Sequence, residues 1–373
     1  MKKYIITIIS AIVLGTSAAS AACDKVNYKN LPDSIFVGGQ TSGHVQGIAY
    51  DAKRHCMYLS FTTRFLKIDH DGNIVGSIER VQGHLGSLTV SPVNGKVYAS
   101  IECIDDEIGQ GVAKRLGIAG YTKENSTLYV AEIDVAKLNR IGMDPEKDDV
   151  IRTFCVHTAM RDYKSGFHGC AGIDGITFVP KNGVKDPGKK AENWQMCIAY
   201  GIYGDVERAD NDCQILITYD IPEYEKYLSP MVFGQLHQNG PQECAAKYYI
   251  YTGNTRYGVQ NMAYDQYTGK LFMAVYKGKK PQYTNPDLFT VDWNPGSFAT
   301  SYEEAVATGQ PLGGWRFKLA STGLFTMGNG YWYISEKIKE KPAKTQACKA
   351  RLFRWDPQDL KGPFVLSCKY DKK

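Results

Sequence analysis

The most regular feature of the chain is a pair of short apolar runs that recurs five times. In each copy a few polar or small residues lead into the first run, as in His44-Val-Gln-Gly-Ile48, and the second run carries a small residue, as in Tyr58-Leu-Ser60. The first runs span 44–48, 84–88, 172–176, 258–262 and 320–324, and the second runs span 58–60, 98–100, 197–199, 272–274 and 333–335. Short apolar runs bounded by turn residues predict paired β-strands.

Two further runs complete each copy. The third run ends on aspartate every time, at Asp69, Asp134, Asp220, Asp292 and Asp356, and a weaker fourth run follows at 74–78, 150–156, 247–252, 315–319 and 364–367. Four short strands repeated with glycine-rich turns are typical of a propeller blade. We therefore predict an all-β fold, a single β-propeller of five blades with four antiparallel strands each. Insertions at 104–126 and 181–194 make the spacing uneven, and only short segments such as 302–307 look helical.

Two alternatives to this fold stay open. Two β-sandwich domains would also contain many short strands, but a sandwich does not need the same four-strand unit five times. A propeller of six blades is possible if the segment Ser34-Ile-Phe-Val37 belongs to a further blade, or this segment could pair with the last unit and close the ring.

The N-terminus has the layout of a secretory signal peptide. Two lysines are followed by an apolar run at 4–14 and by small residues at 16–22, and this run is too short to span a bilayer. We expect residues 1–22 to be removed and residues 23–373 to form the propeller in the periplasm or outside the cell. A lipid anchor on Cys23, which would tether the protein to a membrane, is the alternative.

The ten cysteines favour disulfide bonds, because an oxidising compartment lets such bonds persist. The pair with the best predicted placement is Cys348 and Cys368, which would clamp the last unit.

The balance of 44 basic and 39 acidic residues, without a basic block, argues against nucleic acid as a partner. We expect a monomer that binds a small molecule or an oligosaccharide.

In a propeller, the residues before the first strand and after the second strand of each blade converge near the axis on one face. This rule brings together an unusually polar set, and convergent polar groups at a concave mouth are the default binding-site hypothesis. The predicted binding residues are Gln46, Arg64, Asp174, Tyr200, Tyr203, Gln260, Asn261, Tyr276, Lys277 and Glu336, and the predicted catalytic residues are His44, His84 and Glu102. A solvated, charged rim without a function is the plain alternative.

The residue types suggest roles at this mouth. His44 and His84 occupy equivalent positions in adjacent units, and paired imidazoles suit metal ligation or proton transfer near neutral pH. Glu102, close to Asp105 and Asp106 in sequence, could act as a general base or bind a hard cation such as calcium. Lys277 and its neighbours in the basic loop 277–280, with Arg64, could bind an anionic group on the ligand. The sequence leaves the cofactor itself open.

The blade pattern resembles that of secreted β-propeller proteins in general. The likeness rests on the Gly-Ile-x-x-Asp and Tyr-x-Ser strands and on the stretches 174–178, 199–205 and 257–265, which look like those of exported bacterial proteins. Five blades with a polar axial mouth are also similar in plan to calcium-activated nucleotidases and five-bladed glycosidases. The sequence contains no motif of either family, so this similarity concerns the fold alone.

Two functions follow as hypotheses. The first is a secreted hydrolase or lyase that acts on an anionic or sugar-like small substrate at the axial mouth, with or without a divalent metal. The second is a non-catalytic propeller that recognises a glycan, a peptide or a partner protein. We favour the enzyme, because catalysis needs a convergence of unlike titratable groups and adhesion does not.

Overall fold

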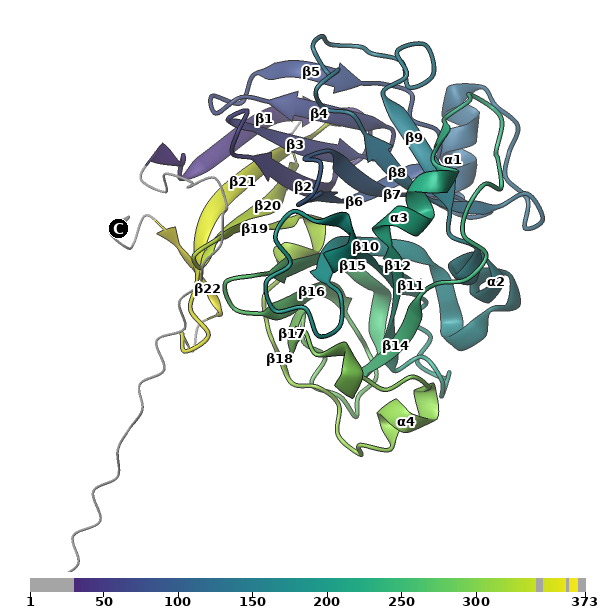
Figure 1. The fold of residues 1–373 in the computed structure, drawn as a ribbon, viewed down its shortest axis with the longest axis vertical. Helices are drawn as coiled ribbons and strands as arrows, with labels where there is room; N and C mark the ends of the chain where they lie inside the picture. The colour runs from purple at the N-terminus through teal and green to yellow at the C-terminus, as the bar shows by residue number, and fades with distance from the viewer. Residues whose placement is uncertain (1–29, 340–344, 360–361, 368–373) are drawn as a thin grey trace, which may run out of the picture.

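A computed structural model describes residues 30–339, 345–359 and 362–367. The predicted signal peptide and Cys23 lie outside the described residues, and so does Cys368. Within the described part, five antiparallel sheets form a five-bladed β-propeller (Figure 1). No helix in this part is both long enough and apolar enough to cross a membrane.

The four main strands of blades 1 to 4 are ordered from the axis outward as they follow in sequence, and blades 2 and 5 each contain five strands. Blade 1 consists of β2 (Val45–Asp51), β3 (Cys56–Phe61), β4 (Arg64–Ile68) and β5 (Ile74–Ile78). Blade 2 consists of β6 (His84–Val90), β7 (Val97–Cys103), β8 (Thr127–Ile133) and β9 (Ile151–Cys155), with the short β13 (Ser229–Pro230) at its outer edge. Blade 3 consists of β10 (Cys170–Pro180), β11 (Trp194–Ile202), β12 (Cys213–Asp220) and β14 (Ala246–Tyr251). Blade 4 consists of β15 (Thr255–Asp265), β16 (Lys270–Lys277), β17 (Leu288–Asp292) and β18 (Gly314–Trp315).

Blade 5 closes the ring by combining both ends of the chain. Its strands β19 (Leu324–Gly328), β20 (Tyr331–Lys339) and β21 (Gln346–Trp355) are joined by β1 (Ser34–Gln40) and β22 (Phe364–Leu366). Both β1 and β22 pair with β21, at Val37↔Cys348 and Phe353↔Leu366 respectively. The predicted pairing of segment 34–37 with the last unit is confirmed, and a sixth blade is not formed because this segment contributes one strand only.

The repeated small residue of the second strand has a structural explanation. The Ser60 hydroxyl donates a hydrogen bond of 2.5 Å to the Gly86 carbonyl, and the Ser100 hydroxyl donates one of 2.8 Å to the Asp174 carbonyl. Each bond joins the second strand of one blade to the inner strand of the next. The second strands are buried on both faces, as in β7, because blades pack face to face. A small hydroxyl therefore fits where a larger side chain would separate the blades.

The repeated aspartate after the third strand closes the following turn in three blades. Asp69 accepts hydrogen bonds from the backbone N–H groups of Asp71 and Asn73, Asp134 from that of Ala136, and Asp356 from that of Gln358. Such side-chain bonds to backbone two residues ahead are characteristic of Asx turns. The pattern noted in the sequence thus marks the start of the turn into the fourth strand.

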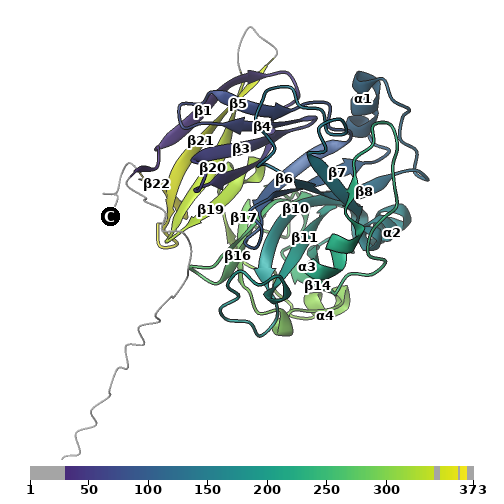
Figure 2. The same ribbon diagram turned by 45° about the horizontal axis from the view of Figure 1, so that its top comes forward.

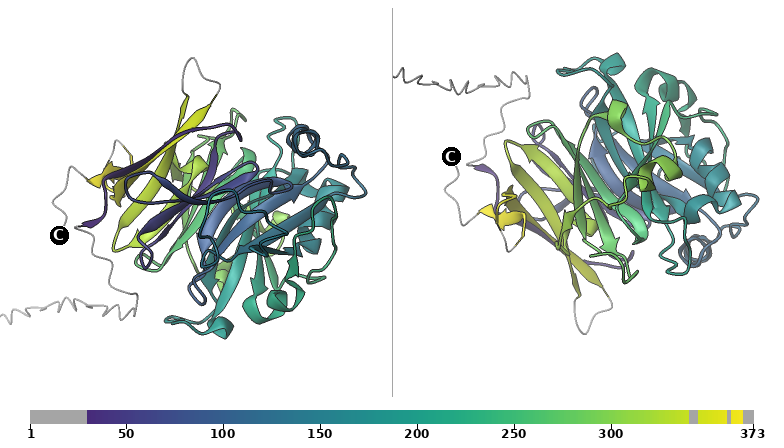
Figure 3. Two further views of the ribbon diagram at one scale, coloured as in Figure 1. Left: turned by 90° about the horizontal axis from the view of Figure 1, so that it is seen from above. Right: turned by 90° about the horizontal axis from the view of Figure 1, so that it is seen from below.

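The insertions hold more helix than the sequence predicted. The expected helical segment 302–307 is confirmed as α4 (Tyr302–Val306), and a short α3 (Ile221–Tyr224) follows β12. Two longer helices were not predicted, α1 (Glu107–Leu116) and α2 (His157–Ser165). Figure 2 shows both beside blade 2. Figure 3 shows α1 and the far ends of β20 and β21 on the same side of the disc, the side of the axial mouth described below.

The cysteines do not form the disulfide network that the sequence favoured. No disulfide joins any two of the eight cysteines in the described ranges, and all but Cys244 are buried. Burial raises the pKa of the Cys103 and Cys155 thiols to about 12, so they stay protonated. Buried cysteines of this kind act as small apolar side chains. Cys348 lies in β21, and its pairing with Cys368 stays a prediction because Cys368 is outside the described residues.

Candidate functional site

A cavity of about 630 Å³ opens at the axis, on the face where the inner strands begin. Its size falls in the range typical of small-molecule sites. Nine of the thirteen side chains predicted at the mouth line it, namely His44, Gln46, His84, Glu102, Asp174, Tyr203, Gln260, Tyr276 and Lys277. The convergence of blades at this face is therefore a property of the structure.

Three predicted residues lie elsewhere, because the strands that carry them run further than expected or begin earlier. Arg64 starts β4 and pairs with Glu79, 2.6 Å from Nε to Oε2. Tyr200 lies inside β11, is fully buried, and donates a hydrogen bond of 2.9 Å to Asp162. Glu336 lies inside β20 and pairs with Arg351 at 2.8 Å. None of the three is among the side chains that line the cavity.

Asn261, the fourth, lies on the axis beneath the cavity and ties four blades together. Its Nδ2 donates to the Gln46 carbonyl at 2.8 Å and to the Ser321 carbonyl at 3.0 Å, and its Oδ1 accepts from the Ser87 hydroxyl at 3.3 Å. The side chain belongs to blade 4, while its partners belong to blade 1, blade 2 and the segment that enters blade 5. With 1% of its surface exposed, Asn261 is a structural crosslink.

The side of the cavity formed by blades 1 to 3 carries a cluster of titratable groups. His84 Nδ1 lies 3.5 Å from Glu102 Oε2, and Glu102 Oε1 accepts a hydrogen bond of 2.8 Å from the backbone N–H of Ile173. Asp174 follows directly and accepts a hydrogen bond of 2.9 Å from Gln260 Nε2. His44 completes the cluster from the start of blade 1.

Gly172 makes the approach of Glu102 possible. A Cβ on this residue would lie 1.9 Å from Glu102 Oε1, and its φ of 147° is rarely adopted by other residues. The pairing of β10 with β11 is irregular at this point, between Cys170 and Gly172 and again between Ile173 and Ile176. Bulges next to a site re-aim side chains, and here the bulge turns the Ile173 N–H toward Glu102.

Burial opposes ionisation of the groups in this cluster. It lowers the pKa of His44 to about 4, with Lys337 and His84 adding to the effect, and it lowers the pKa of His84. It raises the pKa of Glu102 and Asp174 well above the ordinary carboxyl value; the negative charge of Asp106, which also lines the cavity, adds to the shift at both, and that of Glu102 adds to the shift at Asp174. The Nε2 atoms of both imidazoles are buried without a hydrogen-bond partner among the described residues. Burial therefore favours the uncharged form of both the imidazoles and the carboxyl groups in this cluster.

The opposite side of the cavity is cationic. Arg256, Lys277, Lys279 and Lys318 line it, all from blade 4 or the link to blade 5, and all are exposed. In a ring of five blades, blade 4 stands across the axis from blades 1 and 2. The one carboxylate among the lining residues of this side is Asp287, whose pKa is raised by burial. Arg256 donates a hydrogen bond of 2.8 Å to the Tyr257 hydroxyl, which places an exposed aromatic ring beside the cations.

The sequence prediction missed several lining residues. Arg256 and Tyr257 precede the apolar run of blade 4 by one or two positions, and Lys318 and Ser321 precede or open the equivalent segment of blade 5. Extending the same positional rule a few residues upstream would have included them. Asp287 precedes a third strand, and the rule covers only the residues before first strands and after second strands. Asp106 and Ala171 were also not assigned to the mouth.

The basic loop 277–280 is split by the structure. Lys277 and Lys279 line the cavity, whereas Lys280 is buried and donates hydrogen bonds to the Arg208 carbonyl, Asn211 and Asp212. Lys280 thus holds the segment before β12 and is not available to a ligand.

The described residues contain no group of three or more histidine, cysteine, aspartate or glutamate side chains arranged to hold a metal ion. Glu102 is engaged with His84 and Ile173, and Asp105 is exposed and accepts a hydrogen bond from Gln110. The geometry therefore gives no support to the calcium site considered from the sequence.

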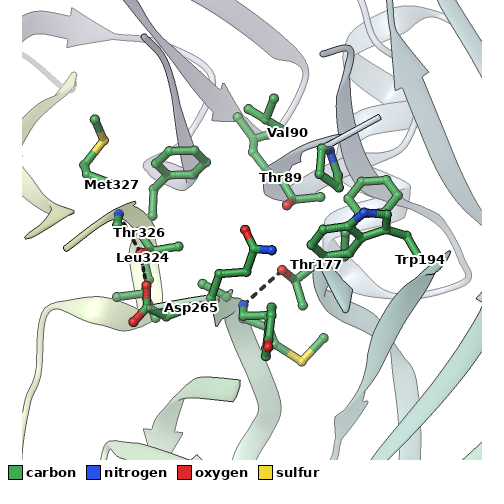
Figure 4. A pocket seen from close by; sticks show the side chains of 17 residues that line it. Thr89, Val90, Thr177, Trp194, Asp265, Leu324, Thr326 and Met327 are labelled. Carbon is green, nitrogen blue, oxygen red and sulfur yellow. Dashed lines mark hydrogen bonds between the residues drawn. The ribbon is translucent and has the colours of Figure 1, made fainter. Parts of the chain in front are cut away.

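A second, smaller cavity of about 240 Å³ lies where the inner strands end (Figure 4). Its lining is mostly apolar, with Trp194, Leu324 and Met327, and its Asp265 is engaged with Thr326 at 2.7 Å. Asn261 is absent from the lining of both cavities. The larger cavity gathers His44, His84, Glu102 and Asp174, whereas Asp265 is the one acidic side chain among the described residues that line the smaller cavity.

Comparison with known proteins gives no family. No family model and no curated protein matches the chain. Among solved structures, cobalt-substituted ACO from Synechocystis is 10% identical, with a TM-score of 0.33 over 88% of this chain and 61% of that one. A Bacteroides caccae protein of unknown function is 11% identical (TM-score 0.29, 70% and 91%), and the WD40 repeats of RRP9 are 7% identical (0.33, 89% and 82%). The chain spans less than two thirds of the Synechocystis protein, and similarities this distant carry no functional argument.

Proposed function

We propose that the chain is an exported enzyme, a hydrolase or a lyase, that acts by acid–base chemistry on an anionic or sugar-like small substrate at the axial mouth. The observation that carries the proposal is the two-sided cavity, with a buried cluster of imidazole and carboxyl groups facing a cationic side. A cavity built only for solvation or adhesion does not require buried groups with perturbed pKa values. Export rests on the sequence of residues 1–22.

The two sides have different roles. Arg256, Lys277 and Lys318 bind the negative charge of the substrate, since guanidinium and ammonium groups donate charge-assisted hydrogen bonds to carboxylate and phosphate oxygens. His44 and His84 accept a proton from the substrate, and Glu102 donates one. The exposed ring of Tyr257, beside Arg256, offers a face on which a sugar ring stacks.

The test is turnover on a panel of nucleotides, phosphoesters and uronic oligosaccharides. The variants His44→Ala, His84→Ala and Glu102→Ala are each expected to lower kcat about 100-fold or more on the substrate that the wild type converts, which is the usual contribution of a general acid or base. His55→Asn is the matched control, because His55 is exposed on the turn between β2 and β3 and asparagine tolerates its φ of 50°. Full activity in all three cavity variants would remove these residues from the mechanism.

A non-catalytic binding propeller is the second candidate, and one observation favours it. Tyr203, Tyr257 and Ile108 present exposed apolar surface at the rim, with exposed fractions of 48%, 41% and 46%. Aromatic rings at an open mouth suit the capture of a glycan without turnover. In that case the same substitutions weaken ligand binding, measured by calorimetry, while the wild type converts no member of the panel.

A further inference from the structure

We propose that the axial cavity catalyses syn β-elimination on a 4-linked uronic-acid polymer in which the C5 hydrogen and the C4 oxygen lie on the same face of the sugar ring, as in mannuronate and glucuronate. This inference rests on the proposed function and names its reaction and substrate class. It follows from three features of the cavity: the cationic side, the two imidazoles, and the location of acid and base on one side.

The cationic side selects a carboxylate and prepares it for reaction. A C–H bond next to a carboxylate is a weak acid, because its removal would add a second negative charge to the same group. Arg256, Lys277 and Lys318 neutralise the first charge and stabilise the second as it develops. Phosphate and sulfate esters would bind to such a side too, but they would gain nothing from a base aimed at a neighbouring C–H bond.

The imidazoles supply the base. The Nε2 atoms of His44 and His84 are buried in the cavity lining without a partner among the described residues, which is unusual for buried polar atoms. An unprotonated imidazole can accept the C5 proton directly. A bound carboxylate also raises the pKa of a nearby imidazole, so substrate binding strengthens the base.

The carboxyl groups supply the acid, and the burial of both argues against glycoside hydrolysis. Both classes of hydrolysing glycosidase that use two carboxyl groups need one of them ionised, as a nucleophile or as a base. Burial raises the pKa of both Glu102 and Asp174, and the charge of Asp106 adds to the effect at each, so ionisation of either carboxyl is opposed. Elimination needs a neutral acid beside a neutral base, and the buried Glu102 carboxyl, 3.5 Å from His84, fits that need.

The placement of these groups predicts the stereochemistry. His44, His84, Glu102 and Asp174 form one continuous cluster from blades 1, 2 and 3, with 3.5 Å between His84 and Glu102, and the cations lie across the axis. A sugar held between the two sides presents one face to both acid and base. Proton removal and proton donation then occur on that face, which fits a ring whose C5–H and C4–O bonds point the same way.

The step is balanced without any co-reactant. His44 takes the C5 proton, and the electron pair of the C5–H bond forms the C4=C5 double bond. The C4–O bond breaks, and the leaving oxygen takes the proton of Glu102. His44 ends as imidazolium and Glu102 as carboxylate, and transfer of the proton from His44 to Glu102 by way of His84, whose Nδ1 lies 3.5 Å from Glu102 Oε2, restores both groups. The products are a new non-reducing end with a double bond and a new reducing end.

The experiment compares two polymers that differ only at C5. Polymannuronate and polyguluronate of equal length are given to the full mature chain, with polyglucuronate as a second syn substrate. Ultraviolet absorbance measures the C4=C5 double bond, a reducing-end assay measures total cleavage, and calorimetry measures binding. We expect absorbance to rise with polymannuronate or polyglucuronate at least ten times faster than with polyguluronate.

Variants assign the roles, and thermal melting confirms that each one folds. His44→Gln and Glu102→Gln are expected to lower kcat at least 100-fold with little change in KM, whereas the double variant Arg256→Gln, Lys277→Gln raises KM at least tenfold. His55→Asn serves again as the control with unchanged activity. Equal activity of wild type and His44→Gln would overturn the assignment of the base.

The outcomes separate this inference from the proposed function. If new reducing ends form without an increase in ultraviolet absorbance, the protein is a hydrolase. This result overturns the elimination but leaves the proposed function in place. Absorbance mainly from polyguluronate overturns the one-sided geometry. Binding without any product overturns the elimination and the enzyme together and leaves the binding propeller, and the absence of both binding and product on all three polymers overturns the substrate class.

Discussion

Asn261 offers the sharpest test of how the propeller holds its axis together, because one side chain crosslinks four blades. Replacing it with alanine removes the two hydrogen bonds donated to Gln46 and Ser321 and the one accepted from Ser87. Each bond contributes about 1 kcal/mol net. We therefore expect Asn261→Ala to lower the free energy of unfolding by about 3 kcal/mol.

This loss converts to a measurable shift in melting temperature. With about 2.1 cal/mol/K per residue, unfolding of a chain of roughly 350 residues has an entropy of about 0.7 kcal/mol/K, so the expected decrease in Tm is about 4 °C. The assay is thermal unfolding followed by circular dichroism and calorimetry. Asn182→Ala is the matched control, since Asn182 lies exposed in the turn between β10 and β11, and its effect should stay within about 0.5 kcal/mol.

Asn261→Asp sharpens the test because it keeps the shape and removes the donor. A carboxylate at this position would face the Gln46 and Ser321 carbonyl oxygens, so its ionised form is disfavoured and its pKa in the folded state rises. The penalty is then largest at neutral pH and shrinks as the pH falls and the group is protonated. A Tm change below 1 °C for Asn261→Ala, or an aspartate variant as stable as the wild type at pH 7, would refute the crosslink.

Three further predictions follow from the cavity and its surroundings. Glu102→Gln should raise the Tm, because the raised pKa of Glu102 in the folded state lowers the stability of the wild type as the pH rises above the ordinary carboxyl value. The difference in Tm should vanish at low pH, and thermal unfolding from pH 4 to 8 measures it. Gly172→Ala should destabilise the fold by about 2 kcal/mol and abolish turnover, since its Cβ would displace Glu102, and denaturant unfolding with a kinetic assay would reveal both effects. Lys280→Met should cost about 3–5 kcal/mol because it leaves the buried Asp212 unpaired, whereas Lys279→Met, on the exposed neighbour, should change stability by less than about 0.5 kcal/mol in the same unfolding assay.

The repeat explains why so much of the fold could be predicted from one sequence. Each inner strand is preceded by polar residues and followed by a second strand with a small residue, and Ser60 and Ser100 show that this small residue joins neighbouring blades. Because the blades pack closely at each equivalent position, the same types of residue recur there in the sequence. Ring closure by β1 was foreseeable for a similar reason, because 34–37 is an apolar segment without a partner nearby in sequence.

Helices and strand ends were harder to predict, for different reasons. α1 is short and polar, so it lacks an apolar face of the usual length. Its capping residues are nevertheless typical of helix ends, since Asp106 accepts a hydrogen bond from the Gly109 N–H and Gly117 ends the helix with a φ of 69°. Tyr200 and Glu336 were misplaced because β11 and β20 continue past the points where their apolar runs end. A strand ends where its pairing with the neighbouring strand ends, and the sequence of one strand alone does not show where that is.

The electrostatic character of the mouth was the least predictable property, since it depends on burial. In sequence, Glu102 and Asp174 are ordinary carboxyl residues more than seventy positions apart, and nothing near either one marks it as protonated. Their pKa values rise because β6, β7 and β10 bring them to the same buried corner, where Gly172 leaves room for one of them. The one local sign that Glu102 approaches the backbone here was the glycine at position 172, near the start of the inner strand β10.

The two ends of the axis differ in the side chains that line their cavities. Asn261, which lines neither cavity, joins blade 4 to blades 1 and 2 and to the segment that enters blade 5. The smaller cavity has an apolar lining, and its Asp265 is fully engaged by Thr268 and Thr326 (Figure 4). Buried carboxyl groups whose ionisation is disfavoured, such as Glu102, line the larger cavity at the mouth. A fold retains such groups where they serve chemistry, so the axial mouth is where substrates should be sought.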